Sequence, residues 1–226
     1  MTADGAPDVL LVEFELARLD LAAATAALRH KDTPAARRHG TSAHASTGVD
    51  GSTADMGPAA GAGRVARTAH PGHPGPVRIL VTGASGFVGS RLATALDGEG
   101  HDVRAMTRRP ERYPGAGAPV AGDVGDEPSL RAALEGCEVA YYLVHSLGDQ
   151  DFERKDADAA RGFAGAAAAA GVGRIVYLGG LGRDGDRLSR HLRSRREVER
   201  LLGGTGLPVT VLRAGIVVGH GGCPGR

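Results

Sequence analysis

From residue 77 onward, short apolar runs alternate with longer amphipathic stretches. The apolar runs have the length and composition of buried strands, and they occupy residues 77–81, 101–107, 119–121, 138–144, 173–178 and part of 208–218. The amphipathic stretches predict helices over residues 88–96, 126–135, 151–170 and 188–202. Apolar strands that alternate with helices are typical of a parallel sheet covered on both faces. Since crossovers between parallel strands are right-handed, we expect an α/β doubly wound sheet, the Rossmann fold, with about six strands in the order 3-2-1-4-5-6.

The chain before residue 77 divides into two parts. Residues 8–30 carry apolar side chains at helical spacing without an internal Gly or Pro, which predicts an N-terminal helix within segment 1–30. This helix could dock on the main domain or on a partner, and Met56 is an alternative start that would exclude it. Residues 31–76 have almost no large apolar side chains to offset the entropy of ordering, which predicts a disordered linker. The folded domain is then expected over 77–219, with an irregular tail over 220–226.

The stretch VRILVTGASGFVGSRLATAL, residues 77–96, passes from a strand through a glycine-rich turn into a helix. Gly83 allows a sharp turn, Gly86 lets the backbone approach a pyrophosphate, and Gly89 lets the helix pack tightly on the strand. Free N–H groups and the positive end of the helix dipole favour a phosphate there. We therefore expect a dinucleotide to bind at Gly83, Ser85, Gly86, Phe87, Val88 and Gly89. The alternative is a plain strand-to-helix turn in another kind of α/β protein.

The turn has the form T-G-x-x-G-x-x-G, and on that spacing the chain resembles the extended or atypical branch of the short-chain dehydrogenase/reductase superfamily. Later motifs resemble an NmrA-like group of bacterial NAD(P)H-binding proteins; they are YYLVHS at 141–146, YLGGL at 177–181, HLRSR at 191–195 and LRAGIVVG at 212–219. The resemblance spans residues 77–219 and implies an NAD(P)H-binding Rossmann domain. Some members of the group have reductase-like assignments, and others sense the cofactor without turning it over.

The end of the second predicted strand bears on the choice of cofactor. An NAD site has an acidic residue about 20 positions beyond the glycines, whereas this strand ends in Thr107-Arg108-Arg109. Arg108 and Arg109 could pair with a 2′-phosphate, which favours NADP(H) over NAD(H); the alternative is that both are solvated loop charges. Asp123-Val124 resembles the Asp-hydrophobic pair that lies beside the adenine ring in this superfamily, and the alternative is a loop Asp that starts a turn.

The sequence departs from the superfamily in its catalytic residues. Carbonyl-reducing members use a Tyr-x-x-x-Lys pair on the helix after strand five and a Ser at the end of that strand, but this strand ends in residues 177–180, Tyr-Leu-Gly-Gly. The nearest match is His191-x-x-x-Arg195, whose spacing places both residues on one helix face. His191 could act as the acid, and Arg195 could hold a ribose or phosphate but cannot donate a proton. The alternative is a solvated basic face, and Tyr177 is expected to pack in its strand.

His145-Ser146 ends the fourth predicted strand, at the edge of the sheet where ligands bind in open α/β folds. These two residues complete the candidate catalytic set with His191 and Arg195. Ser146 has a neighbouring His but no evident orienting acid, so a hydrolase is not expected.

Composition and charge narrow the classes of function. The formal net charge of +1 gives no case for nucleic-acid binding. The two cysteines, Cys137 and Cys223, suit neither a zinc site nor a redox pair, and no metal site is predicted. No secretory leader and no run of 18 apolar residues is evident, so we expect a cytoplasmic protein without a membrane span.

The chain ends soon after the sixth predicted strand, so we expect it to lack most of the segment that shapes the substrate pocket in this superfamily. The favoured hypothesis is an NADPH-preferring oxidoreductase that acts on an unknown small molecule. The alternatives are a non-catalytic NAD(P)-sensing module and an inactive truncated fragment. A homo-oligomer or a partner subunit could complete the domain.

Overall fold

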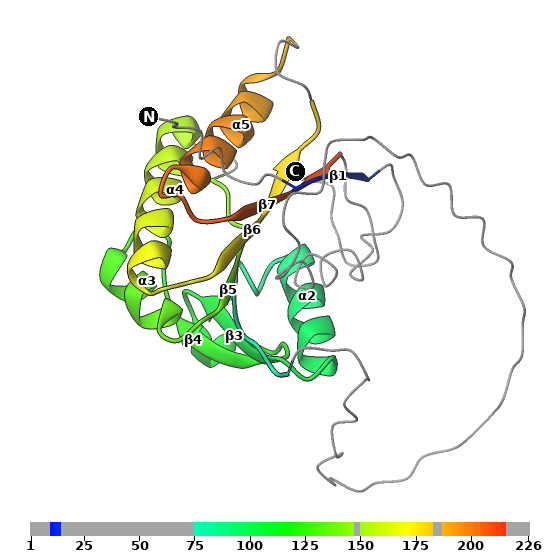
Figure 1. Ribbon diagram of the computed structural model, residues 1–226, viewed down its shortest axis with the longest axis vertical. Coiled ribbons are helices and arrows are strands. Elements are labelled where there is room, and N and C mark those ends of the chain that lie inside the picture. The colour runs from blue at the N-terminus through cyan, green and yellow to red at the C-terminus, as the bar shows by residue number, and fades with distance from the viewer. Residues whose placement is uncertain (1–9, 15–74, 147–149, 183–186, 216–226) are drawn as a thin grey trace, which may run out of the picture.

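A computed structural model describes residues 10–14, 75–146, 150–182 and 187–215 and contains one parallel sheet (Figure 1). Its seven strands follow the order β1-β7-β6-β5-β2-β3-β4. From β1 to β7 they comprise Leu10–Phe14, Arg78–Thr82, Asp102–Thr107, Ala118–Ala121, Val139–Tyr142, Arg174–Gly180 and Val209–Ala214. Strands β2 to β7 have the predicted order 3-2-1-4-5-6, which confirms the Rossmann fold.

The first strand corrects the sequence-based prediction for its residues. Residues 10–14 form β1, which pairs in parallel with β7, in place of the N-terminal helix predicted over 8–30. Without β1, strand β7 would be the edge of the sheet and would present a row of unpaired backbone groups. The pairing of residues 10–14 with this edge overrides their local helical pattern. The other residues of that predicted helix lie outside the described residues, as do nearly all of the predicted linker 31–76 and the tail 220–226.

Helices cover the two faces of the sheet unequally in the described part of the chain (Figure 1). Helix α2, Phe87–Gly98, packs on one face, and α3, α4 and α5 pack on the other. These three helices comprise Glu127–Leu134, Phe152–Ala169 and Arg190–Gly203, and a short 3₁₀ turn, η1, comprises Pro110–Arg112. Asp126 caps α3, because its Oδ2 accepts the Ser129 N–H at 3.2 Å.

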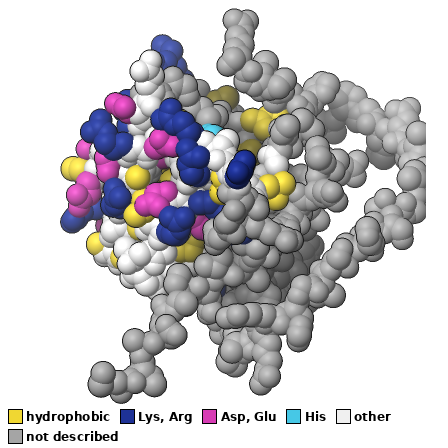
Figure 2. Space-filling view, turned by 90° about the horizontal axis from the view of Figure 1, so that it is seen from above, with side chains coloured by type: hydrophobic (Ala, Val, Ile, Leu, Met, Phe, Trp, Pro, Cys, Tyr) yellow, Lys and Arg dark blue, Asp and Glu magenta, His cyan; other side chains and the backbone are white. Residues whose placement is uncertain are grey.

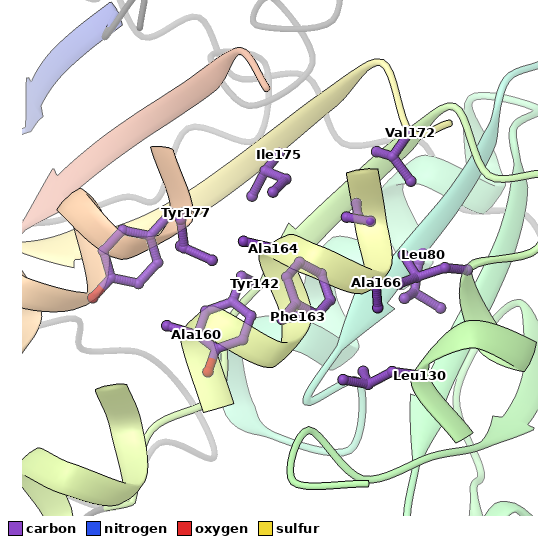
Figure 3. Close-up of a cluster of buried hydrophobic side chains, with 14 of the residues drawn as sticks. Leu80, Leu130, Tyr142, Ala160, Phe163, Ala164, Ala166, Val172, Ile175 and Tyr177 are labelled. Carbon is purple, nitrogen blue, oxygen red and sulfur yellow. The ribbon is translucent and has the colours of Figure 1, made fainter. Parts of the chain in front are cut away.

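The larger hydrophobic cluster lies between the sheet and helices α3, α4 and α5 (Figure 3). The Tyr142 ring on β5 packs against the Phe163 ring on α4, with centroids 4.9 Å apart. The Tyr177 ring on β6 also lies beside the Tyr142 ring, with centroids 6.1 Å apart. All three side chains are almost fully buried. This packing fixes β5, β6, α4 and α5 relative to one another, and the carboxyl ends of the parallel strands meet along one edge.

Candidate functional site

The glycine turn between β2 and α2 has the geometry predicted for a phosphate-binding loop. Gly83 has φ of +65°, a conformation that L side chains rarely adopt. The Gly86 N–H donates to the Gly83 carbonyl oxygen at 2.9 Å and closes the turn. A Cβ on Gly89 would lie 2.2 Å from that same oxygen, so only glycine permits the helix to approach the turn this closely. Gly83 and Gly89 are therefore required by the backbone itself.

The amino end of α2 is open to an anion. Its N-cap is Gly86, which supplies no side-chain cap, and the first turn contains no acidic residue. Ser85 and Gly86 are exposed, whereas Phe87 and Val88 are half-buried. Exposed N–H groups and the positive end of the dipole, without a competing carboxylate, suit a pyrophosphate.

Thr82 has a role that the sequence reasoning missed. Its side chain is fully buried; its hydroxyl donates to the Tyr141 carbonyl oxygen at 2.9 Å and accepts the Leu143 N–H at 3.0 Å. Thr82 thus joins the carboxyl ends of β2 and β5 just beneath the glycine turn. A Thr in a buried strand immediately before a glycine motif was the available signal, since a buried hydroxyl requires partners.

The arginines after β3 are exposed and available to a ligand. Neither the Arg108 nor the Arg109 side chain forms a hydrogen bond or an ion pair with another described residue. They follow Thr107, the last residue of β3, and β3 lies next to β2 in the sheet. Two unpartnered guanidinium groups therefore follow the strand that neighbours the glycine turn.

Asp123 and Val124 follow β4. The Asp123 Oδ1 accepts the Gly125 N–H at 2.8 Å, which is the turn-starting role of the alternative interpretation. Val124 is half-buried and packs against the larger hydrophobic cluster. Asp123 is exposed, so an adenine-contacting role stays a prediction.

Two histidines from distant parts of the chain meet beyond the carboxyl end of β5. The His145 and His191 rings have centroids 6.2 Å apart at an interplanar angle of 68°. The His145 Nδ1 is buried and has no hydrogen-bond partner in the part of the chain that the structure describes. Burial, and then the positive charge of Arg195, lower the pKa of His145 to about 4. The same two causes lower the pKa of His191, so both imidazoles are mainly neutral at pH 7.

Ser146 is held through its backbone. Its N–H donates to the Asp156 Oδ1 at 2.7 Å, and the Asp156 Oδ2 accepts the Ser194 hydroxyl at 3.3 Å. The sequence reasoning missed Asp156, because a single Asp on a helix gives no signal until its burial is known. A carboxylate is therefore present near Ser146, but it is hydrogen-bonded to Ser194 and to the Ser146 backbone.

Arg195 faces the sheet rather than open solvent. Its Nη1 donates to the Leu178 carbonyl oxygen on β6 at 2.9 Å, and its Nε is buried with no hydrogen-bond partner among the described residues. Its own carbonyl oxygen accepts the Tyr177 hydroxyl at 3.2 Å. Tyr177 packs in the core as predicted, and burial raises its pKa to about 12. Helix α5 is thereby docked on the end of β6, with His191 one turn before Arg195.

A separate cavity of about 390 Å³ lies beside α5 and contains none of the predicted site residues; it is lined by Glu153, Leu188, Arg193, Ser194, Arg196, Glu197 and Arg200. Within the described ranges, no three His, Cys, Asp or Glu side chains are placed to hold a metal ion. Over the same residues, no helix combines the length and apolar character needed to cross a bilayer. Basic and acidic side chains are intermixed on the visible described face (Figure 2).

A family model described as NAD(P)H-binding matches residues 83–220, which is more than half of the chain. The chain belongs to this NAD(P)H-binding family. The matched segment begins at Gly83 and includes β3 to β7, so the glycine turn and the histidine pair both lie within it.

Relatives of this NAD(P)H-binding domain include longer proteins. An uncharacterized protein of Mycobacterium tuberculosis is 31% identical over 145 residues, which cover 64% of this chain and 15% of that protein. The ceramide reductase of Caulobacter vibrioides is 29% identical over 150 residues, which cover 63% of this chain and 47% of that protein. The chain thus spans less than half the length of either relative.

Solved structures share the fold of this NAD(P)H-binding domain. The triphenylmethane reductase of Citrobacter sp. has a TM-score of 0.54 at 23% identity, over 60% of this chain and 48% of that chain. The enzyme WbmG of Bordetella bronchiseptica, in complex with NAD, has a TM-score of 0.53 at 24% identity, over 64% and 55% of the two chains. Together with the family match, these likenesses establish an NAD(P)H-binding domain with the Rossmann fold.

Proposed function

We propose that this NAD(P)H-binding domain serves an oxidoreductase that prefers NADPH and reduces a small molecule at the carboxyl ends of β5 and β6. The observation that carries the proposal is the meeting of His145 and His191 beside those strand ends, in a sheet whose β2–α2 turn suits a pyrophosphate. Names of relatives support the class of reaction, since they include a ceramide reductase and a 3-beta-hydroxysteroid dehydrogenase.

The residues present fit the cofactor. Gly83 and Gly89 lie too close together for residue 89 to carry a Cβ. The open amino end of α2 would hold the pyrophosphate. Arg108 and Arg109 would hold a 2′-phosphate, because a guanidinium pairs with phosphate through parallel N–H donors. Related folds hold either NADP(H) or NAD, so the choice between the two rests on these arginines.

Bound NADPH would supply a hydride, and the chain would supply the proton. His191 is half-buried and faces His145, and it is the nearest counterpart of the acid in the superfamily. Its imidazole would donate a proton to the oxygen of a carbonyl or quinone acceptor. Arg195 keeps its proton and one of its donors binds the Leu178 carbonyl oxygen, so its role would be to orient α5 beside the site.

A second candidate is a binding module that senses NAD(P)H without turnover. Two observations favour it: the Tyr-x-x-x-Lys pair is absent from α5, and the lowered pKa values leave both histidines mainly neutral at pH 7. A neutral imidazole is a weaker acid than an imidazolium, so proton donation would be slow, and turnover would require a substrate whose reduction needs little acid catalysis.

One experiment separates the two candidates. The protein is mixed with NADPH and a panel of quinones and aldehydes, and the absorbance of NADPH is followed over time. Turnover that falls at least about a hundredfold in His191→Ala, but persists in the exposed control Arg200→Ala, is the result expected of the enzyme. Tight NADPH binding without oxidation across the panel is expected of the sensor, and the absence of NADPH binding would contradict both.

A further inference from the structure

Asp156 is a buried carboxylate that has no cationic partner among the described residues. It lies in the second turn of α4 and is 6% exposed. Its two oxygens accept the Ser146 N–H at 2.7 Å and the Ser194 hydroxyl at 3.3 Å. A buried charge without an ion pair destabilises a fold by several kcal/mol unless hydrogen bonds offset it, so its presence here calls for a function.

The partners of Asp156 come from the two segments that carry the histidine pair. Ser146 directly follows His145 in the loop after β5, and Ser194 lies one turn beyond His191 on α5. The carboxylate therefore connects the loop, α4 and α5 at the point where the two imidazoles meet. Helix α4 thus contacts both histidine-bearing segments through one side chain.

The charge of Asp156 opposes the other influences on both histidines. Burial and the cation of Arg195 on α5 disfavour the imidazolium form of both histidines, and His191 also disfavours it at His145, whose ring it contacts. The Asp156 carboxylate on α4 acts in the opposite direction on both rings. Tyr142 and Tyr177 contribute no charge at neutral pH, since burial raises the pKa of each hydroxyl.

We infer that Asp156 is a positioning residue: it holds the loop bearing His145 against the helix bearing His191, and its charge stabilises the protonated His191 imidazole. This inference rests on the proposed function, in which His191 donates the proton. Asp158 on the same helix offers a contrast, because it is exposed and its partner among the described residues is Arg161, in solvent.

The effect of the Asp156 charge on His191 is tested by NMR titration of the histidine ring protons in the full chain without cofactor. The His191 signal is assigned by its loss in His191→Gln. Asp156→Asn keeps the shape and an acceptor for Ser146 but removes the charge, so the His191 titration midpoint should fall by at least about half a pH unit. Asp158→Asn is the matched control and should leave the midpoint unchanged. An unchanged midpoint in folded Asp156→Asn, or an equal shift in Asp158→Asn, would overturn the inference.

The positional part is tested by hydrogen exchange of the Ser146 amide. In Asp156→Ala this amide loses its acceptor and should exchange at least about tenfold faster, while the Tyr141 amide in β5 keeps its rate. Unchanged exchange at Ser146 would overturn this part, and if Asp156→Ala does not fold, the titration of Asp156→Asn still decides. Both readouts are made without NADPH or acceptor, so a failure of the proposed reaction is distinguishable from a failure of this inference.

Discussion

A Cβ atom on Gly89 would lie 2.2 Å from the carbonyl oxygen of Gly83, 2.8 Å from its carbonyl carbon and 2.9 Å from the Cα of Ala84. All three contacts are with backbone, which cannot rotate away as a flexible side chain could. The first turn of α2 can therefore lie this close to the glycine turn only because residue 89 has no Cβ. Any enlargement at this position moves the helix away from the place where a phosphate would bind.

Gly89→Ala should accordingly destabilise the domain by about 1–3 kcal/mol, because the overpacked helix must shift from the turn. NADPH affinity should fall at least about tenfold, since the N–H groups of α2 move with the helix. Urea unfolding and calorimetric titration measure the two effects. Gly98→Ala is the control, because a Cβ there meets nothing within 4 Å; equal effects of the two substitutions would contradict the close-packing argument.

The cofactor preference should depend on the arginines after β3. The double substitution Arg108→Gln and Arg109→Gln should weaken NADPH binding at least about tenfold, which corresponds to about 1.4 kcal/mol, and should leave NADH binding unchanged. Arg112→Gln is the matched control, because Arg112 is exposed but lies beside Glu111. If wild-type protein binds NADPH and NADH equally well, the preference is wrong whatever the variants do.

The buried hydroxyl of Thr82 should stabilise the fold. Thr82→Val leaves the Leu143 N–H and the Tyr141 carbonyl oxygen without their partner in the interior, so we expect a loss of about 1–3 kcal/mol in the free energy of unfolding. Thr94→Val is the control, because the Thr94 hydroxyl is exposed and donates within α2 to the Ser90 carbonyl oxygen. Urea midpoints that shift equally for both variants would show that Thr82 has no special role.

His145 should make stability depend on pH. Its pKa is about 4 in the folded protein against an ordinary value of 6.5, so the unfolded chain binds more protons between these values. Stability should therefore be complete above about pH 6.5 and decline as the pH falls toward 4, by about 1–3 kcal/mol from this residue. His145→Gln should show a shallower decline in urea unfolding between pH 7 and pH 4.5, whereas parallel curves for the two proteins would refute the assignment.

Much of the fold follows from the local pattern of the sequence, and the exceptions have physical causes. The six strands from Arg78–Thr82 to Val209–Ala214 were predictable, because each is a short apolar run and helical segments separate most of them. Residues 10–14 were not, because their strand is formed by pairing with β7, a contact more than 190 positions away in sequence. Sequence spacing cannot show which distant edge a short apolar run will pair with.

The site was predictable to the extent that its chemistry is local. The glycine turn follows from one continuous motif, and His191 and Arg195 follow from helical spacing. The contact of His145 with His191 and the burial of Asp156 depend on how α4 and α5 pack on β5 and β6, and no local pattern encodes that packing. For the same reason, the hydrogen bond from Arg195 to the Leu178 carbonyl oxygen could not be predicted from local spacing.

Calorimetric titration of Gly86→Glu with NADPH tests whether the β2–α2 turn holds the pyrophosphate of the cofactor. Gly86 is exposed and has φ of −80° and ψ of 171°, an ordinary backbone conformation. A Cβ there would lie 3.2 Å from the Gly83 carbonyl oxygen, which requires only a small shift of the turn, so the variant should keep its fold by circular dichroism. The introduced carboxylate should lower NADPH affinity at least about tenfold relative to wild type, because it repels the pyrophosphate. Unchanged NADPH affinity in the folded variant would contradict pyrophosphate binding at this turn.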